Sequence, residues 1–188
     1  MGDPISPAMA ISACAWMEDV WMKALPADTK GRFMAKRFMD DILIVLAKST
    51  EWDYDGFIRD FTKSTCYQEP LKLEEGKDGT FLETRFEIKQ NTVRYKLKND
   101  NEMENKIWRY QHYLSYAPFL QKRATLTACL KKVQQHASDR DNLYASALNK
   151  IAEFRDLGYP LDVLKKACLF LGATSGEAMW LTVRRALR

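Results

Sequence analysis

The sequence predicts an α+β fold, in which a first half of mixed helices and strands is followed by a second half of helices alone. Two observations carry this prediction. In the first half, turn residues separate short apolar runs at 33–47 and 71–98, as in β-hairpins. After the polar run 99–102, helix-forming segments bounded by prolines, glycines and capping residues continue to the end of the chain.

The first half is expected to begin with two helices around a β-hairpin. A helix is expected over 7–24, because Ser6 suits the N-cap and Pro7 suits the first helical position. Apolar strands on either side of Asp40-Asp41 predict a hairpin over 33–47, with the two aspartates at its bend. Apolar spacing then predicts an amphipathic helix over 52–67.

A small sheet and a domain boundary are expected next. Three β-like runs, at 71–74, 80–89 and 92–98, are separated by glycine-rich and Gln-Asn turns. The polar run that follows is the best candidate for a boundary between a domain at 1–98 and a helical domain at 103–188.

Four helices are expected in the second half. Their predicted limits are Pro118 and His136 for the first, Ser138 or Asp139 and Gly158 for the second, Leu161 and Gly172 for the third, and Ser175 for the start of the fourth.

Composition excludes several classes of protein. Hydrophobic residues make up 46% and charged residues 29%, so wholesale disorder is not expected. No run approaches the roughly 20 apolar residues of a membrane-spanning helix, and the start of the chain has no basic region typical of a signal peptide. The four cysteines are scattered, which argues against a zinc site or a disulfide scaffold. We therefore expect an intracellular protein with reduced thiols and no membrane partner.

The charge is distributed unevenly. Residues 1–98 hold 15 Lys+Arg and 16 Asp+Glu, a net charge of −1, whereas residues 99–188 hold 14 and 9, a net charge of +5. A basic half suits a polyanion such as nucleic acid. Ordinary solvated faces would explain the distribution equally well if charge were the only observation.

The adjacent carboxylates of Asp40 and Asp41 suggest a metal site. Side by side they repel, and a divalent cation relieves that repulsion. Magnesium accepts one or two protein carboxylates when phosphates supply the other ligands, and two such ions about 3.5–4 Å apart can clamp an in-line phosphoryl transfer. A solvated turn is the simpler explanation for a bare Asp-Asp pair, but the flanking apolar strands favour an organised site.

Three motifs resemble those of reverse transcriptases. Phe38-Met39-Asp40-Asp41 resembles the xxDD signature, and Gly2-Asp3-Pro4-Ile5-Ser6-Pro7 resembles the upstream GxPxSP segment, whose following helix lies beneath the incoming nucleotide. Downstream, Phe81-Leu82-Glu83-Thr84 resembles the FLG or FLD-type hairpin that grips the primer. The order and spacing of the three motifs also agree with the family.

The second half is similar to the thumb of Penelope-like retroelement reverse transcriptases. The similar positions are Tyr116-Ala117-Pro118, Lys122-Arg123 and Gly158-Tyr159-Pro160, with Ala117 where the family often has His. The resemblance implies that 1–98 is the C-terminal part of a palm and 103–188 a helical thumb. In the family the first catalytic aspartate and the fingers precede GxPxSP, so we expect the chain to be inactive alone.

The resemblance assigns roles to particular residues. Asp40 would bind a catalytic Mg²⁺ directly and Asp41 would support it, in a two-ion site completed by an upstream aspartate. RNA template, DNA primer and dNTP are the implied partners. The remaining assignments are the nucleotide floor for Gly2, Pro4, Ser6 and Pro7, the primer grip for Phe81, Leu82, Glu83 and Thr84, and duplex phosphates for Lys122 and Arg123. Each assignment has a structural alternative. The nucleotide-floor residues would simply start a helix, the primer-grip residues would form an ordinary hairpin, and Lys122 and Arg123 would lie at a solvated helix end.

Weaker expectations complete the interpretation. Met39 would pack beside the primer end, and Lys72 is a weak candidate for the proton donor to pyrophosphate. An aromatic cluster is expected to pack between palm and thumb rather than stack on nucleotides; it comprises Trp108, Tyr110, His112, Tyr113 and Tyr116. An unpaired palm edge would favour self-association. The alternative function is a degenerate, non-enzymatic reverse-transcriptase fragment that at most binds nucleic acid.

Overall fold

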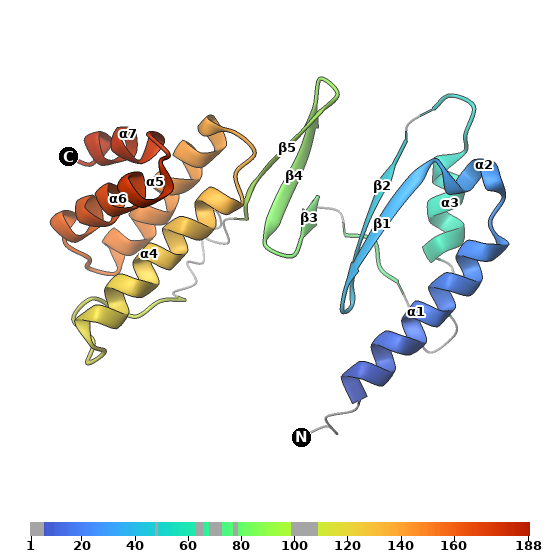
Figure 1. Ribbon diagram of the computed structural model, residues 1–188, viewed down its shortest axis with the longest axis horizontal. Coiled ribbons are helices and arrows are strands. Elements are labelled where there is room, and N and C mark those ends of the chain that lie inside the picture. Colours follow the sequence, from blue (N-terminus) through green and yellow to red (C-terminus); the bar gives the residue numbers. More distant parts are fainter. Residues whose placement is uncertain (1–5, 48, 63–65, 68–72, 77–78, 99–108) are drawn as a thin grey trace. The chain divides into compact units, whose positions relative to one another are not determined.

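The computed structural model divides into two compact units, residues 1–77 and 78–188, which are described separately below (Figure 1). The residues that it describes are 6–47, 49–62, 66–67, 73–76, 79–98 and 109–188. The fold is α+β, as the sequence predicts. Within the described residues, no helix combines the length and apolar character that a membrane crossing needs.

The first unit contains a hairpin accompanied by helices. Its elements are α1 (Ser6–Ala24), α2 (Ala27–Lys30), β1 (Phe33–Phe38), β2 (Asp41–Leu46) and α3 (Tyr54–Asp60). The predicted helix over 7–24 and the predicted hairpin are confirmed. The second helix is shorter than the predicted 52–67 and ends at Asp60. It begins at Tyr54 because Asp53 caps it: the Asp53 carboxylate accepts a hydrogen bond from the Gly56 N–H at 2.8 Å.

Aromatic rings form the core of the first unit. Trp21 of α1 lies 5.1 Å from Phe61 and 6.0 Å from Phe33 of β1, and Phe33 lies 4.8 Å from Phe57 of α3, measured between ring centroids. Rings at these separations attract one another in addition to the area that they bury. The alternation of β1 that places Phe33 on this inner face also exposes Met34 on the outer face.

The second unit begins with a three-stranded antiparallel sheet, in the order β3 (Thr80–Phe81), β4 (Thr84–Lys89) and β5 (Thr92–Leu97). The predicted strand 80–89 is therefore two strands, because the chain turns at Leu82 and Glu83, with a left-handed φ of 55° at Leu82. The predicted strand 71–74 is not observed at residues 73 and 74, and its other two positions lie outside the described residues.

Four helices follow, and they pack around one apolar core (Figure 1). They are α4 (Phe119–Gln135), α5 (Arg140–Asp156), α6 (Leu161–Ser175) and α7 (Met179–Ala186). Phe154 of α5 and Trp180 of α7 are its largest fully buried side chains. The predicted starts at Pro118 and Asp139 are confirmed as N-caps of α4 and α5.

The predicted stop at Gly172 and the predicted cap at Ser175 are wrong. Helix α6 continues through Gly172 to Ser175 and ends at Gly176, whose φ is 70°. A left-handed residue after the last turn ends a helix, whereas glycine with helical dihedrals costs only about 1 kcal/mol. Gly172 lies where α6 meets α7, and a Cβ there would contact Trp180 and Leu181 at about 3.6 Å.

The three-stranded sheet belongs to the same compact unit as the helices, so the division between units precedes the predicted boundary at 99–102. The polar run 99–102 did not predict this division, because the sheet is joined to the helices by contacts between residues distant in sequence. These contacts connect β5 with the start of α5. The structural division also separates charge more sharply. Residues 1–77 carry 10 Lys+Arg and 13 Asp+Glu, a net −3, and residues 78–188 carry 19 and 12, a net +7.

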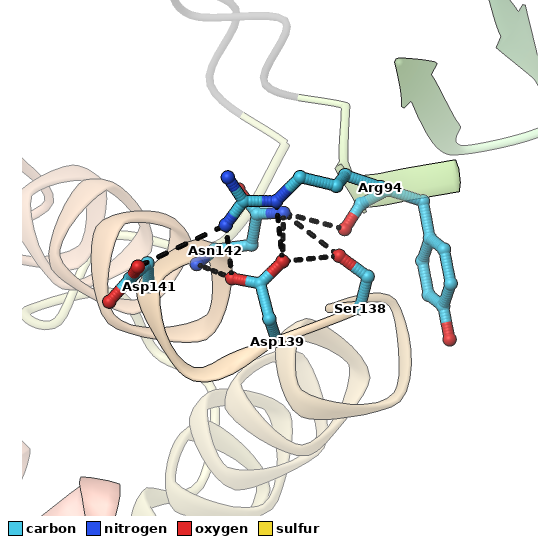
Figure 2. Close-up of polar contacts among 6 residues, drawn as sticks. Arg94, Ser138, Asp139, Asp141 and Asn142 are labelled. Atoms are coloured by element: carbon cyan, nitrogen blue, oxygen red, sulfur yellow. Dashed lines mark hydrogen bonds and ion pairs between the residues drawn. The ribbon is translucent and has the colours of Figure 1, made fainter. Parts of the chain in front are cut away.

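Asp139 joins β5 to the N-terminus of α5 (Figure 2). Its carboxylate accepts hydrogen bonds from Arg94 Nε at 3.0 Å, from Ser138 Oγ at 2.6 Å and from the Asn142 N–H at 2.9 Å. The Asn142 side chain also donates to the Tyr95 carbonyl at 3.3 Å. The Arg94 hydrogen bond, followed by those from Ser138 and Asn142, holds the pKa of Asp139 well below its usual range.

We expect Asp139→Ala to destabilise the second unit by about 1–2 kcal/mol, because it removes a helix cap together with a charge-assisted hydrogen bond. The lowered pKa of Asp139 means that its contribution is present above about pH 4 and lost progressively at lower pH. Urea unfolding followed by circular dichroism should therefore show a difference between wild type and variant that narrows below about pH 4.

The matched control is Asp141→Ala. Asp141 is 94% exposed and lies 3.9 Å from the same Arg94, so its removal should cost less than about 0.5 kcal/mol. Equal losses in the two variants, or a loss at Asp139 that does not depend on pH, would contradict this account of the joint.

Candidate functional site

The two adjacent aspartates lie at a two-residue turn. Phe38 pairs with Asp41, so only Met39 and Asp40 form the turn between β1 and β2. Met39 adopts a left-handed φ of 54°. The side chains of Asp40 and Asp41 are both exposed. The predicted position of the pair at the hairpin bend is therefore confirmed for Asp40, whereas Asp41 is the first residue of β2.

A groove of about 320 Å³ lies between this turn and the start of α1. Met39 and Asp40 line it from the turn, and Pro7, Ala10 and Ile11 line it from α1. The structure thus brings a residue of the GxPxSP-like segment and the first aspartate of the pair to the same groove. Ser6 is the first described residue of α1, and Gly2 and Pro4 lie outside the described residues.

Arg37 fixes the turn. Its Nη1 donates to the Met39 carbonyl at 2.8 Å, and its Nε donates to Glu18 of α1 at 2.6 Å. The Tyr67 hydroxyl accepts from Arg37 and donates to Glu18. The guanidinium also lies 5.0 Å from the centre of the Tyr67 ring. The conformation of the aspartate turn is therefore tied to α1 through a network of charged and polar groups.

Sequence reasoning did not identify this network, although one signal was present. Arg37 occupies an inward-facing position of β1, at two-residue spacing from Phe33 and Ala35. Burying a charge without a partner costs folding free energy, so an arginine at this position indicates a carboxylate on the facing helix. Glu18 supplies it.

The thiol beside this network is not reactive. Cys66 is buried, and burial together with the nearby Glu18 raises the pKa of its thiol to about 11. A thiol with such a pKa stays protonated at neutral pH and is a poor nucleophile.

The aspartates partly fit a magnesium site. Two adjacent carboxylates supply hard oxygen donors, which suit an ion that takes its other ligands from water and phosphates. Within the described part of the chain, no group of three or more His, Cys, Asp or Glu side chains could hold a metal ion, and Glu18 is paired with Arg37. Asp40 and Asp41 would therefore supply only part of the ligands that such a site needs.

The predicted primer grip forms a tight hairpin tip in the second unit. Phe81 pairs with Thr84, and Leu82 at the turn is 43% exposed. Glu83 forms an ion pair with Lys132 of α4, and the buried Thr84 hydroxyl lies 2.6 Å from His136 Nδ1. Burial, and secondarily Lys132, lowers the pKa of His136. Glu83 and Thr84 thus anchor the tip to α4, and Leu82 and Glu83 are both exposed to solvent.

The two cations predicted to contact phosphates lie in different environments. Lys122 is 6% exposed, and its ammonium donates to the carbonyls of Tyr113 and Ser115, at 2.6 Å each. These bonds fasten the segment before α4 to the helix, so the expectation of a phosphate contact does not fit Lys122. Arg123 is exposed, and its guanidinium lies 5.8 Å from the Phe119 ring centre.

The aromatic residues before α4 pack inside the second unit. Tyr110 stacks on Phe154 at 5.0 Å, and Tyr113 packs against Tyr159 at 5.2 Å, between ring centroids. Burial raises the pKa of Tyr110. Tyr116 is fully exposed. Tyr110 and Tyr113 therefore pack within the second unit; Trp108, like Lys72, lies outside the described residues.

The Gly158-Tyr159-Pro160 motif has a clear structural role as the connection from α5 to α6. The Gly158 N–H donates to the Arg155 carbonyl and the Tyr159 N–H to the Phe154 carbonyl, the pattern of a Schellman cap. Gly158 has a φ of 80°, and a Cβ there would lie 3.0 Å from His112. Tyr159 is buried and Pro160 caps α6.

The chain matches no protein-family model, no curated protein and no solved structure. Interpretation of the groove therefore depends on the motifs and on the arrangement of their side chains.

Proposed function

We propose that this chain is part of an RNA-directed DNA polymerase of a mobile retroelement. The first unit would supply the C-terminal part of the palm, and the second unit the primer-grip sheet and the thumb. The observation that carries the proposal is the groove shared by Pro7 and Asp40, because two motifs that are distant in sequence meet at one place. In a polymerase palm the nucleotide lies between these two elements.

The groove has the lining that such a role needs. Its volume of about 320 Å³ falls in the range of small-molecule sites, and its lining combines apolar residues of α1 with Asp40 of the turn. Asp40 and Asp41 would hold Mg²⁺, which when bound neutralises phosphate charge and acidifies the primer hydroxyl. Arg37 would keep the turn, and with it the Asp40 carboxylate, in one orientation through the Met39 carbonyl.

The second unit would hold the nucleic acid. Its net charge of +7 favours a polyanion, and phosphate contacts give affinity without sequence preference. Arg123 is the exposed cation that the thumb resemblance assigns to the duplex. Leu82 is exposed at the tip of the hairpin and would be the grip residue that contacts a primer.

Primer extension tests the proposal. The protein to use is a polymerase in which residues 1–188 follow an upstream palm strand with its aspartate and fingers, assayed with an RNA template, a DNA primer and Mg²⁺. We expect dNTP incorporation. A protein that binds the hybrid normally but extends no primer under any divalent ion would instead support the alternative, a non-enzymatic nucleic-acid-binding fragment.

Hybrid binding by the chain should be weak, with a shallow-to-moderate dependence on salt and little sequence preference. For duplex DNA each phosphate contact contributes roughly −0.9 to the slope of log affinity against log salt, so Arg123→Ala should make the slope shallower by about that amount. Fluorescence anisotropy over about 50 to 200 mM salt measures it. An affinity that does not change with salt, or that depends strictly on sequence, would contradict the prediction.

A further inference from the structure

A groove of the second unit lies between α4 and α6. Its volume is about 830 Å³. The two helices lie side by side in Figure 1. On α4 the groove extends from Leu120 to Gln135, a rise of about 22 Å, which matches four turns of another helix.

The floor of this groove is apolar and accessible. Leu120 is 75% exposed and Phe170 is 54% exposed, and Ala124 lies between them in the lining. Single exposed apolar residues are ordinary, but a hollow that gathers a leucine, a phenylalanine and small side chains is typical of a surface that binds an apolar face.

The rim of the groove carries charge of one sign. Arg123, Lys131 and Lys166 line it, and all three are exposed. None of the described residues that line the groove carries a carboxylate, and α4 contains no acidic residue. In the part of the chain that the structure describes, none of the three cations forms an ion pair with a carboxylate. Their charge is therefore available to a ligand.

We propose that the α4–α6 groove docks an amphipathic helix of a protein partner, with acidic residues flanking an apolar stripe. Apolar side chains of the partner at i, i+3, i+4 and i+7 would enter the hollow beside Phe170 and Leu120, and its acidic residues would meet the cations of the rim. The apolar floor favours this occupant over nucleic acid, because interfaces with phosphate backbones are more polar.

The probe is a synthetic helical peptide of about 15 residues with a leucine stripe flanked by glutamates, compared with a peptide of the same stripe flanked by lysines. We expect the acidic peptide to bind, and NMR shifts to cluster on α4 and α6. Phe170→Ala should weaken its binding about 10-fold, the usual effect of truncating an aromatic anchor. Lys166→Glu should weaken it as well, whereas hybrid binding should be unaffected by Phe170→Ala.

Two residues of α6 outside the groove lining serve as controls. Leu169 is 45% exposed, so Leu169→Ala removes a comparable exposed side chain and should leave peptide affinity unchanged, and Lys165→Glu should have less effect than Lys166→Glu. The proposal is overturned if the acidic and basic peptides bind alike, or if Phe170→Ala and Leu169→Ala act alike. It is also overturned if the RNA–DNA hybrid or a second copy of the chain, rather than the acidic peptide, shifts Phe170 and Lys166 of α6.

Discussion

Asp40→Asn should abolish primer extension by a polymerase that contains this chain, with a loss of about 10²–10⁴-fold in rate, equivalent to several kcal/mol of transition-state stabilisation. Asparagine keeps the size and shape of the side chain and removes its charge. The turn itself should persist, because its conformation depends on the bond from Arg37 to the Met39 carbonyl and not on the Asp40 carboxylate. Hybrid affinity should remain at the wild-type level.

The matched control for this variant is Asp28→Asn. Asp28 is an exposed aspartate of α2, in the same unit and away from the groove lining, so its substitution should leave extension unchanged. Asp41→Asn should give a loss between the two, as expected for a supporting ligand. Near-normal extension by the Asp40 variant would refute the assignment of Asp40, even if the protein proves to be a polymerase.

The elements that depend on neighbouring residues could be predicted from the sequence. The hairpin over 33–47 follows from two apolar strands around a polar bend, and α4 begins after Pro118 because proline suits a helix start. The position of Asp40 at the turn follows from the same pattern. Local chemistry thus determined both the elements and the central residue of the candidate site.

The features that were missed depend on contacts distant in sequence. The sequence predicts that Lys122 is a solvated cation. In the structure its ammonium instead donates hydrogen bonds to two backbone carbonyls of the segment that precedes α4. The sheet joins the helical unit through Arg94 and Asp139, which are 45 positions apart. Only the tertiary arrangement brings Arg37 to Glu18 and Tyr67. Periodicity and capping signals contain no information on such pairings.

Trp180→Ala should destabilise the second unit by about 3–5 kcal/mol, the usual cost of removing a buried tryptophan. The side chain is 0% exposed, and its indole N–H donates to Gln134 Oε1 of α4 at 2.8 Å. The substitution therefore leaves a large cavity at the contact of α7 with the other helices and removes the partner of a polar group. Trp180→Phe fills most of the cavity and should cost less.

Because small domains are stable by only about 5–15 kcal/mol, this loss should remove a large fraction of the stability of the second unit and lower its unfolding temperature. Urea unfolding followed by circular dichroism measures it, and Leu181→Ala, at a neighbouring position that is 38% exposed, is the control expected to cost far less. If the thumb unit holds the nucleic acid, hybrid binding should be lost over the same temperature range in which the Trp180→Ala protein unfolds. A variant that unfolds but keeps wild-type hybrid affinity would show that binding does not depend on the second unit.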